Sequence, residues 1–237
     1  FSLFKPEVVT HQAAQPSLRY SLDYPNEDAL VNIIGTLNVI AACKQFEVKH
    51  LVFASTSAVY DPDGMTPFLE DDPLEPNLPY GIAKLASEMY VRNLCPSHTI
   101  LRYGNVYGPR QVTVGENQLV PHVLNHIKKG FEFKINGDGL QTRDFVYVGD
   151  IARANWLALT RQFTGTFNAG TGRATSVNSI CQILGSITKF AGQFENGPRK
   201  AGEAQNVELN SQALAAFGWK PETSLYDGLC LTAEAYQ

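Results

Sequence analysis

Short apolar runs alternate with helical patterns along the first part of this sequence. Runs typical of buried strands occur at Val8-Val9, at Leu51-Val52-Phe53 and at Ile100-Leu101, and helical spacing runs from Leu30 to Phe46 and again from Tyr80. Parallel strands need long crossover connections, which are usually helices, whereas antiparallel strands can be joined by tight turns. The alternation therefore predicts an α/β fold in which helices cover both faces of a parallel sheet.

The rhythm changes after Pro109. A helical pattern spans residues 121–129, and a short strand is expected over residues 132–135. Further strand and helix patterns follow at residues 167–169 and 177–190. The second half of the chain is therefore predicted to form a smaller lobe beside the sheet.

The composition and charge of the sequence argue against several classes of protein. The net charge of -4 comes without a long basic run, which argues against a nucleic-acid partner. No apolar stretch reaches the roughly 18 residues that suggest a membrane span, and no export signal is visible, so a cytoplasmic protein is expected. The cysteines lie far apart, without the spacing of a metal site, and the histidines are equally scattered. We predict reduced thiols and no metal.

Tyr80 and Lys84 are four residues apart in a helical pattern, so their side chains are expected to share one helix face. A phenol titrates near ~10 and is a poor base at neutral pH unless a cation stabilises the phenolate. Lys84 can supply that cation. Apolar side chains form a stripe on the opposite face and are predicted to pack internally, namely Ile82, Leu85, Ala86 and Met89. By itself, the Tyr-x-x-x-Lys motif also fits a solvated helix face.

The segment before this helix supplies a context. An apolar strand ends at Ser55, Thr56 and Ser57, and hydroxyl groups at the carboxyl end of a parallel strand face the ligand crevice of the sheet. Thr56 precedes Tyr80 by about two dozen residues. The strand end and the Tyr-x-x-x-Lys helix are therefore expected to meet at one site.

Further motifs cover nearly the whole chain, at Lys5–Gln15, Asn32–Thr36, Leu101–Arg110, Thr142–Val148 and Phe217–Pro221. With the hydroxyl and Tyr-x-x-x-Lys motifs, they resemble the extended short-chain dehydrogenase/reductases, in particular the NAD-dependent epimerase/dehydratase family and its UDP-glucose 4-epimerase-like members. The resemblance implies a partial NAD-binding Rossmann-like domain over residues 1–110. It implies a mainly substrate-binding lobe over residues 111–237, with residues 144–170 returning to the first domain.

The resemblance also implies roles for individual residues. Tyr80 would take the proton from the 4-hydroxyl of a nucleotide sugar, Lys84 would lower the pKa of Tyr80, and Thr56 would bond the reacting oxygen. Two larger groups of residues are implied to bind the ligands. The NAD-binding group comprises Ala13, Ala14, Asn32, Ser55, Tyr80, Lys84 and Tyr103. The group that binds the nucleotide sugar comprises Asn105, Asn117, Gln118, Leu119, Arg143, Lys200 and Glu203.

Two departures from the family bear on function. Dehydratases of this family carry an acid beside the threonine, where this chain has Ser57 and Ala58, so an epimerase or a 4-keto reductase is favoured over elimination of water. The glycine-rich turn that binds the cofactor pyrophosphate does not occur in this sequence, so weak retention of NAD is expected. A non-catalytic module that binds or assembles around a sugar nucleotide is the alternative from another class. The resemblance implies a homodimer, paired through two long helices that include the one bearing Tyr80.

Overall fold

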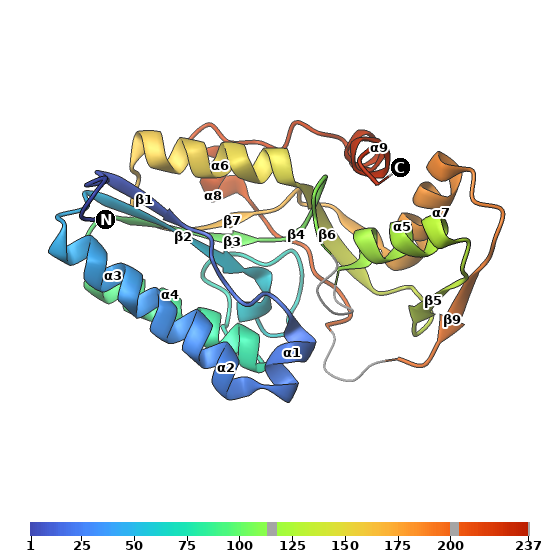
Figure 1. The fold of residues 1–237 in the computed structure, drawn as a ribbon, viewed down its shortest axis with the longest axis horizontal. Coiled ribbons are helices and arrows are strands. Elements are labelled where there is room, and N and C mark those ends of the chain that lie inside the picture. Colours follow the sequence, from blue (N-terminus) through green and yellow to red (C-terminus); the bar gives the residue numbers. More distant parts are fainter. Residues whose placement is uncertain (113–117, 200–203, 237) are drawn as a thin grey trace.

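A four-stranded parallel sheet forms the centre of the larger part of the molecule (Figure 1). The computed structural model describes residues 1–112, 118–199 and 204–236. Within them the strands lie in the order β1 (Val8–His11), β2 (His50–Thr56), β3 (His98–Tyr103) and β7 (Gly165–Ala169). All three pairings are parallel, as the alternating pattern predicted.

Strand β2 is buried from His50 to Ser55 because helices cover both of its faces. Phe53 points into a cluster with residues of the helices on one face, and Val52 into a cluster with helix α6 (Val148–Arg161) on the other. Successive side chains of a strand point to opposite faces. A continuous apolar run is therefore what a strand covered on both sides requires.

The first helical layer contains a continuous stretch with an irregular turn. Helix α1 (Leu18–Asp23) is followed by α2 (Pro25–Ala29), by the π-helix η1 (Leu30–Ile34) and by α3 (Gly35–Gln45). The helix predicted from Leu30 to Phe46 is present, but its first turn is this π-helix. Single π-turns inside α-helices often occur at functional sites.

Helix α4 (Pro79–Leu94) lies next to α3, and its orientation differs from the prediction. Ile82 and Met89 of the apolar stripe are 53% and 56% exposed, whereas Lys84 and Glu88 are buried. The packing prediction was therefore wrong for Ile82 and Met89, whereas Leu85 is partly buried and packs against a core cluster that contains Val59 and Tyr60. The face of α4 toward the sheet has small side chains, which allow the helix to approach the sheet closely. The charged side chains on this face are buried because other parts of the fold supply partners for them.

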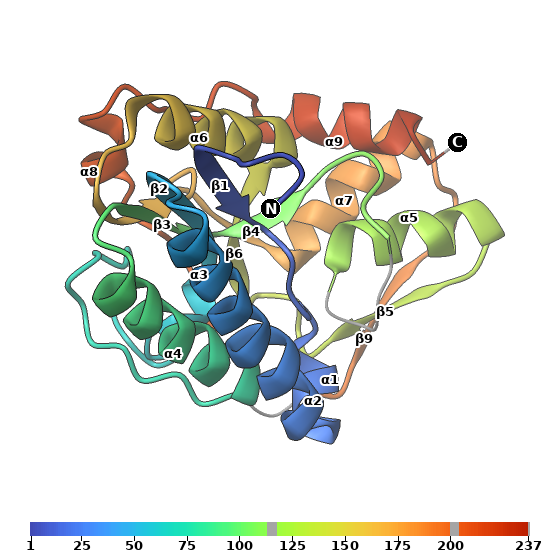
Figure 2. The ribbon, with the colours of Figure 1, turned by 60° about the vertical axis from the view of Figure 1, so that its left-hand side comes forward.

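Among the described residues, the second lobe consists of two small sheets and the helices beside them (Figure 2). One sheet has the order β4 (Asn105–Tyr107), β6 (Thr142–Tyr147) and β8 (Ala174–Ser176), and the other pairs β5 (Phe133–Asn136) with β9 (Phe194–Gly197). The helices are α5 (Leu119–Lys129), α7 (Val177–Thr188) and α9 (Leu225–Glu234), and they enclose an apolar cluster with parts of β5 and β6. Helices α6 and α8 (Gln212–Ala215) lie instead over the large sheet, so the chain returns to it twice.

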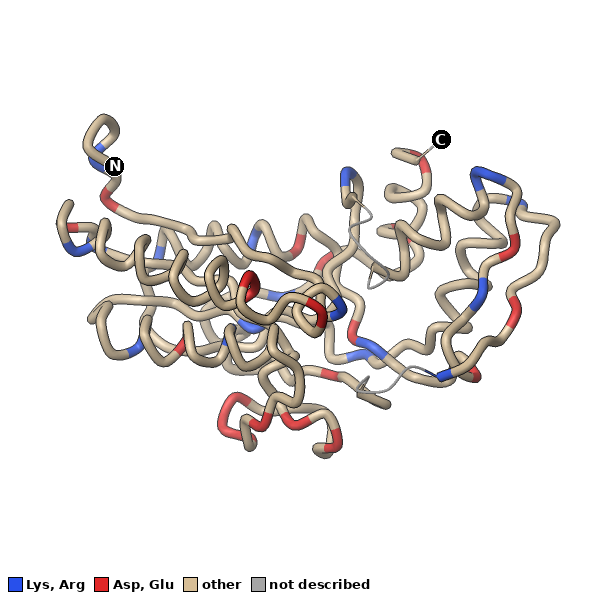
Figure 3. Tube along the Cα trace, turned by 60° about the horizontal axis from the view of Figure 1, so that its bottom comes forward, with Lys and Arg blue, Asp and Glu red and all other residues tan. Residues whose placement is uncertain are grey.

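Charged residues are distributed over both lobes, with acidic residues gathered in one loop (Figure 3). This acidic loop, residues 60–78, joins the short 3-10 helix η2 (Ser57–Val59) to α4 and contains no lysine or arginine. Across the described ranges, no helix is both long enough and apolar enough to cross a membrane.

Candidate active site

A cavity of about 350 Å³ opens at the carboxyl ends of β2 and β3, between the two lobes. Its lining includes most of the residues that the sequence implicated, namely Ser55, Thr56, Tyr80, Tyr103, Asn105, Gln118, Leu119 and Arg143. The strand ends and the lobe together therefore form one site at the edge of the sheet where α/β proteins bind ligands.

Tyr80 and Thr56 meet at this cavity. Both side chains line it, and Thr56 Oγ1 accepts a bond of 3.1 Å from the amide of Ala58. The helix approaches closely because residue 81 is glycine, since a Cβ there would overlap the carbonyl oxygen of Ala58. The amide of Tyr80 donates to Ser21 Oγ at 3.1 Å, which ties the start of α4 to α1. The start of α4, which bears Tyr80, is therefore held in place by its contacts with η2 and with α1.

Burial raises the pKa of Tyr80 to about 12, and the charge of Asp28 adds to the rise, whereas the bond from Thr56 opposes it. A phenol with this pKa stays protonated at neutral pH. Proton abstraction by Tyr80 therefore requires positive charge close to its oxygen.

Lys84 lies one helical turn from Tyr80 and is 3% exposed. Its Nζ atom is 4.2 Å from the centre of the Phe53 ring, a distance suited to a cation–π contact. Burial lowers the pKa of Lys84 to about 8, while the carboxylates of Glu88 and Asp28 act in the opposite direction. The ammonium form thus still predominates at neutral pH.

Tyr103 occupies the end of β3 and is held by polar contacts. Its hydroxyl donates to Gln12 Oε1 at 3.0 Å and accepts a bond of 2.7 Å from Asn155 Nδ2. Ser55 is buried and donates to Glu88 Oε1, and it also lines the cavity, so its predicted contact with NAD stays a prediction. Ser55 therefore connects β2 to α4 directly beside Thr56.

The remaining cofactor candidates lie on the loop after β1 and on η1. Ala13 is exposed and Ala14 is half-buried, and neither lines the cavity. Asn32 is buried, and its side-chain amide bonds the carbonyl of Gln15 and the carboxylate of Asp28. Asn32 thus holds the loop after β1 in place, and its predicted contact with NAD stays a prediction.

The donor groups at this edge fit a nicotinamide nucleotide. A phenol at Tyr80 and an ammonium at Lys84 lie beside each other at the end of the sheet. A second phenol, that of Tyr103, lies on the neighbouring strand. Vicinal ribose hydroxyls and a carboxamide are the groups that such donors bond. These residues would hold the nicotinamide end of NAD.

A second cavity, of about 480 Å³, adjoins the first and shares Asn105, Leu119 and Arg143 with it. Its other lining residues come mainly from α5 and β5, namely His122, His126, Glu132, Phe133, Lys134, Ile135 and Asn136. Sequence reasoning missed this group because its members were interpreted as a helix, a strand and scattered histidines. Their place around one cavity depends on how β5 packs against the rest of the second lobe.

Two further polar groups lie in the first cavity, and sequence reasoning missed one of them, Gln111. The side-chain oxygens Oε1 of Gln111 and Gln118 are buried without a hydrogen-bond partner in the part of the chain that the structure describes. Both residues line the cavity, and only Gln118 was predicted. Unsatisfied buried acceptors are uncommon, and a ligand rich in hydroxyl donors would satisfy them.

Three predicted substrate residues, Asn117, Lys200 and Glu203, lie outside the described residues.

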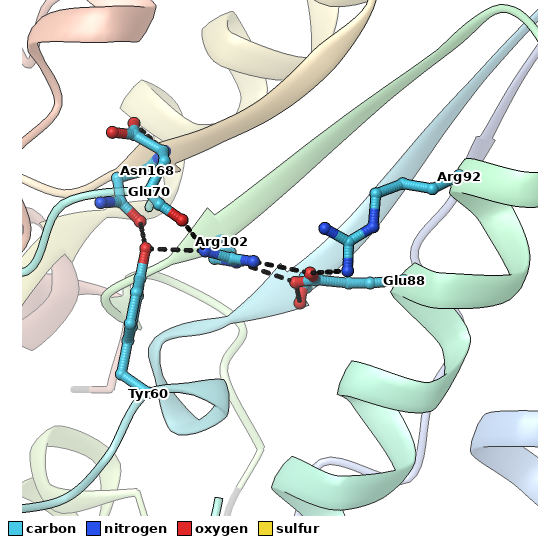
Figure 4. A network of polar contacts seen from close by, with 7 residues as sticks. Tyr60, Glu70, Glu88, Arg92, Arg102 and Asn168 are labelled. Carbon is cyan, nitrogen blue, oxygen red and sulfur yellow. Dashed lines mark hydrogen bonds and ion pairs between the residues drawn. The ribbon is translucent and has the colours of Figure 1, made fainter. Parts of the chain in front are cut away.

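A buried ion pair supports the rear of the site (Figure 4). Arg102 on β3 donates to both carboxylate oxygens of Glu88 on α4, at 3.0 and 2.8 Å, and both residues are almost fully buried. Arg102 also donates to Tyr60 Oη at 2.9 Å and to the carbonyl of Glu70 at 2.9 Å. The network thus joins the helix of Tyr80 to β3 and to the acidic loop.

Comparisons with a family model and with known proteins identify the same family. The model of the "NAD dependent epimerase/dehydratase family" matches residues 1–170. A UDP-glucose 4-epimerase of Mycolicibacterium smegmatis is 35% identical over 243 residues, which span 99% of this chain and 77% of that protein.

Solved structures agree with the sequence relatives. The UDP-glucose 4-epimerase of Thermotoga maritima, solved with UDP-glucose, is 39% identical with a TM-score of 0.94, covering 100% of this chain and 79% of its own. That of Thermus thermophilus, in complex with NAD, is 35% identical with a TM-score of 0.92 and the same coverage. The predicted α/β fold, family, enzyme class and NAD dependence are confirmed at this level. The chain belongs to the NAD-dependent epimerase/dehydratase family and is of its epimerase type.

Proposed function

We propose that this protein interconverts UDP-glucose and UDP-galactose, or closely related UDP-sugars, by inverting the configuration at C4 through a 4-keto sugar. One observation carries the proposal: Thr56 and Tyr80 line the same cavity at the end of the sheet, with the buried Lys84 one helical turn from Tyr80. This arrangement suits removal of a proton from a secondary hydroxyl, because a base and an oxygen-binding hydroxyl share one cavity and a cation belongs to the same helix as the base.

In the proposed reaction, Tyr80 accepts the proton of the 4-hydroxyl, and the Thr56 hydroxyl bonds the same oxygen as it becomes a carbonyl. NAD, when bound, supplies a reversible acceptor for the hydride of C4. The ammonium of Lys84, one helical turn away, would favour the phenolate form of Tyr80 against the rise in pKa that burial causes. After the keto sugar turns its other face toward the nicotinamide, Tyr80 returns the proton to the oxygen.

The two adjoining cavities support a nucleotide sugar as the substrate. Thr56 and Tyr80 line the first cavity, which would bind the hexose. The second cavity would bind the uracil and its ribose. Arg143 lines both cavities, which supports a role for its guanidinium in binding the diphosphate that would connect the two ends of the substrate. The acidic loop contains no lysine or arginine. The positive charge that binds the diphosphate would therefore come from the second lobe.

A second copy of the chain is the proposed partner. Ile82 and Met89 on α4 are exposed, and so are Val31 and Ile34 on η1, which packs against α4. Contiguous exposed apolar side chains of this kind mark interaction surfaces. Pairing of α3 and α4 with the same helices of another protomer would cover them, as the family resemblance implies.

The experiment is conversion of UDP-glucose to UDP-galactose by the purified protein with NAD, followed by chromatography of the nucleotide sugars. We expect an equilibrium mixture of the two sugars and no net change in NADH absorbance. Net consumption of a reduced cofactor would identify a 4-reductase, and a 4-keto-6-deoxy product would identify a dehydratase. Binding of UDP without NAD binding or conversion would identify a non-catalytic module.

A further inference from the structure

Helix α5 presents a row of side chains to the second cavity. Leu119, His122 and His126 all line it, and their spacing of three and four residues places them on one helix face. Leu119 and Arg143 also line the first cavity, so they mark the junction of the two. His126 lies seven residues beyond Leu119, which corresponds to about 10 Å along the helix axis. His126 therefore belongs to the end of the second cavity that is farther from the first.

An aromatic ring from β5 borders this far end. Phe133 is only partly buried and lines the same cavity as His126. The two rings meet edge-on, with their centroids 5.2 Å apart and their planes at 80°. Aromatic side chains provide surfaces on which nucleobases stack. If Arg143 binds the diphosphate at the junction, the base of the substrate lies at the end that Phe133 and His126 form.

A hydrogen bond within α5 determines which ring nitrogen of His126 carries the proton. Its Nδ1 atom lies 2.8 Å from the carbonyl oxygen of His122, one turn earlier in the helix. A carbonyl oxygen only accepts hydrogen bonds, so Nδ1 donates and holds the proton. In the neutral ring the other nitrogen, Nε2, is then an acceptor. Among the described residues, Nε2 has no hydrogen-bond partner.

An acceptor at this place distinguishes pyrimidine bases by their edges. Uracil carries a donor, N3–H, between its two carbonyl oxygens, whereas N3 of cytosine is itself an acceptor. Nε2 of His126 can accept a hydrogen bond from uracil. Opposite cytosine, two acceptors would face each other and both would lose the bonds that they make in water. Thymine has the same N3–H as uracil, so this contact separates uracil and thymine from cytosine only.

We propose that His126 is a specificity-determining residue whose Nε2 atom accepts the N3–H of the substrate's base, so that the site selects uridine over cytidine nucleotides. This inference rests on the proposed function for the place of the base. The carbonyl of His122 maintains the selectivity, because His126 could present a donor at Nε2 in its neutral form only by giving up the bond from Nδ1. Arg143 and the hexose cavity are unaffected by the identity of the base.

The test measures binding of three nucleotides to the purified protein by calorimetry: UDP, CDP, and UDP methylated at N3. The methylated nucleotide keeps the uracil ring and lacks only the donor. We expect UDP to bind about 10-fold or more tightly than either of the others, which corresponds to one lost hydrogen bond and an acceptor left unsatisfied. In histidine-labelled protein, the ¹⁵N shifts of His126 should show a proton on Nδ1, and the Nε2 signal should move with UDP but not with CDP.

Two substitutions of His126 separate its two nitrogens. His126→Asn keeps a donor for the carbonyl of His122 and lacks the distal acceptor, so UDP should bind as weakly as CDP. His126→Gln places an amide near the position of Nε2, and this amide can turn to accept or to donate. It should therefore retain the affinity for UDP and gain affinity for CDP. Lys129→Ala, at the exposed end of α5, is the control and should leave the preference for UDP unchanged.

An unchanged preference for UDP in His126→Asn overturns the proposal. If that variant does not fold, the unaltered protein decides the matter, because a proton on Nε2, or an Nε2 signal that UDP leaves in place, also overturns it. Conversion of UDP-sugars by a protein that fails these tests leaves the proposed function standing. A preference for UDP that depends on His126, in a protein that shows no epimerisation, leaves base recognition standing and refutes the proposed function.

Discussion

Thr56 and Tyr80 line one cavity at the carboxyl end of β2, although η2 and the acidic loop separate them in the chain. They meet because α4 starts against the backbone of η2, at Gly81 and Ala58. Tyr80 is consequently placed by main-chain packing, and its chemistry depends on the charges behind it.

Tyr80→Phe tests the role of the phenol. The ring is retained and only the proton acceptor is lost, so we expect kcat to fall about 10²- to 10⁴-fold with UDP affinity unchanged. Steady-state kinetics and calorimetry measure these two quantities. Tyr90→Phe, on an exposed tyrosine of the same helix, is the matched control and should retain full activity. Comparable activity in the two variants would exclude Tyr80 as the base.

The pH profile should show an alkaline limb that belongs to Lys84. Burial lowers its pKa to about 8, so above this pH the ammonium loses its proton and no longer favours the phenolate of Tyr80. The rate should therefore decline from about pH 8 upward. Lys84→Arg, whose cation does not titrate in this range, should be less active at pH 7 but should lose the alkaline limb. An identical limb in both proteins would assign it to another group.

Glu88→Gln is expected to destabilise the protein by about 3 kcal/mol, because Arg102 is then left as a buried charge without its partner. Chemical denaturation gives the free energy of unfolding. The control is Glu7→Gln, which breaks the exposed ion pair with Lys49 and should leave the unfolding midpoint unchanged. Equal effects of the two substitutions would contradict the importance of the buried pair.

Gly81→Ala should move α4 away from η2. A Cβ at this position would overlap the carbonyl oxygen of Ala58, so we expect lower stability and a loss of kcat larger than the loss of substrate affinity. Gly35→Ala is the matched control, since a Cβ there meets only Leu30 O at 3.8 Å. It should stabilise the helix by up to about 1 kcal/mol. Normal kcat in Gly81→Ala would show that the close approach is dispensable.

Ile82→Lys places a charge on the exposed face of α4. If that face joins two protomers, the substitution should convert a dimer to a monomer, which sedimentation velocity can measure. Trp156→Lys alters an equally exposed apolar residue on α6, over the other face of the sheet, and should leave the oligomeric state unchanged. A monomeric unaltered protein would contradict the proposed dimer.

The sequence predicted the order of strands and helices well, because buried parallel strands such as His50–Thr56 have a continuous apolar run that few other elements share. It also placed Thr56 and Tyr80 at one site. The buried face of α4 was predicted wrongly, because amphipathic patterns assign lysine and glutamate to solvent. Lys84 and Glu88 are buried by virtue of partners distant in the chain, Phe53 and Arg102, which a local pattern does not contain.

The second cavity and the environment of Asp28 were also outside the reach of the sequence. Residues of α5 and β5 line the cavity together, and β5 pairs with β9, about 60 residues later in the chain, which no local motif predicts. Asp28 carries no motif of its own, and its burial follows from the packing of α2 and η1 on α4.

Retention of isotope at C4 tests the central claim most directly. UDP-galactose labelled with deuterium at C4 is incubated with the purified protein and NAD, and the UDP-glucose formed is analysed by mass spectrometry and NMR. Hydride removal and return within one site predict UDP-glucose that keeps the label at C4, without net NADH. Loss of the label to solvent, or no conversion in a folded protein that binds both UDP and NAD, would contradict the account.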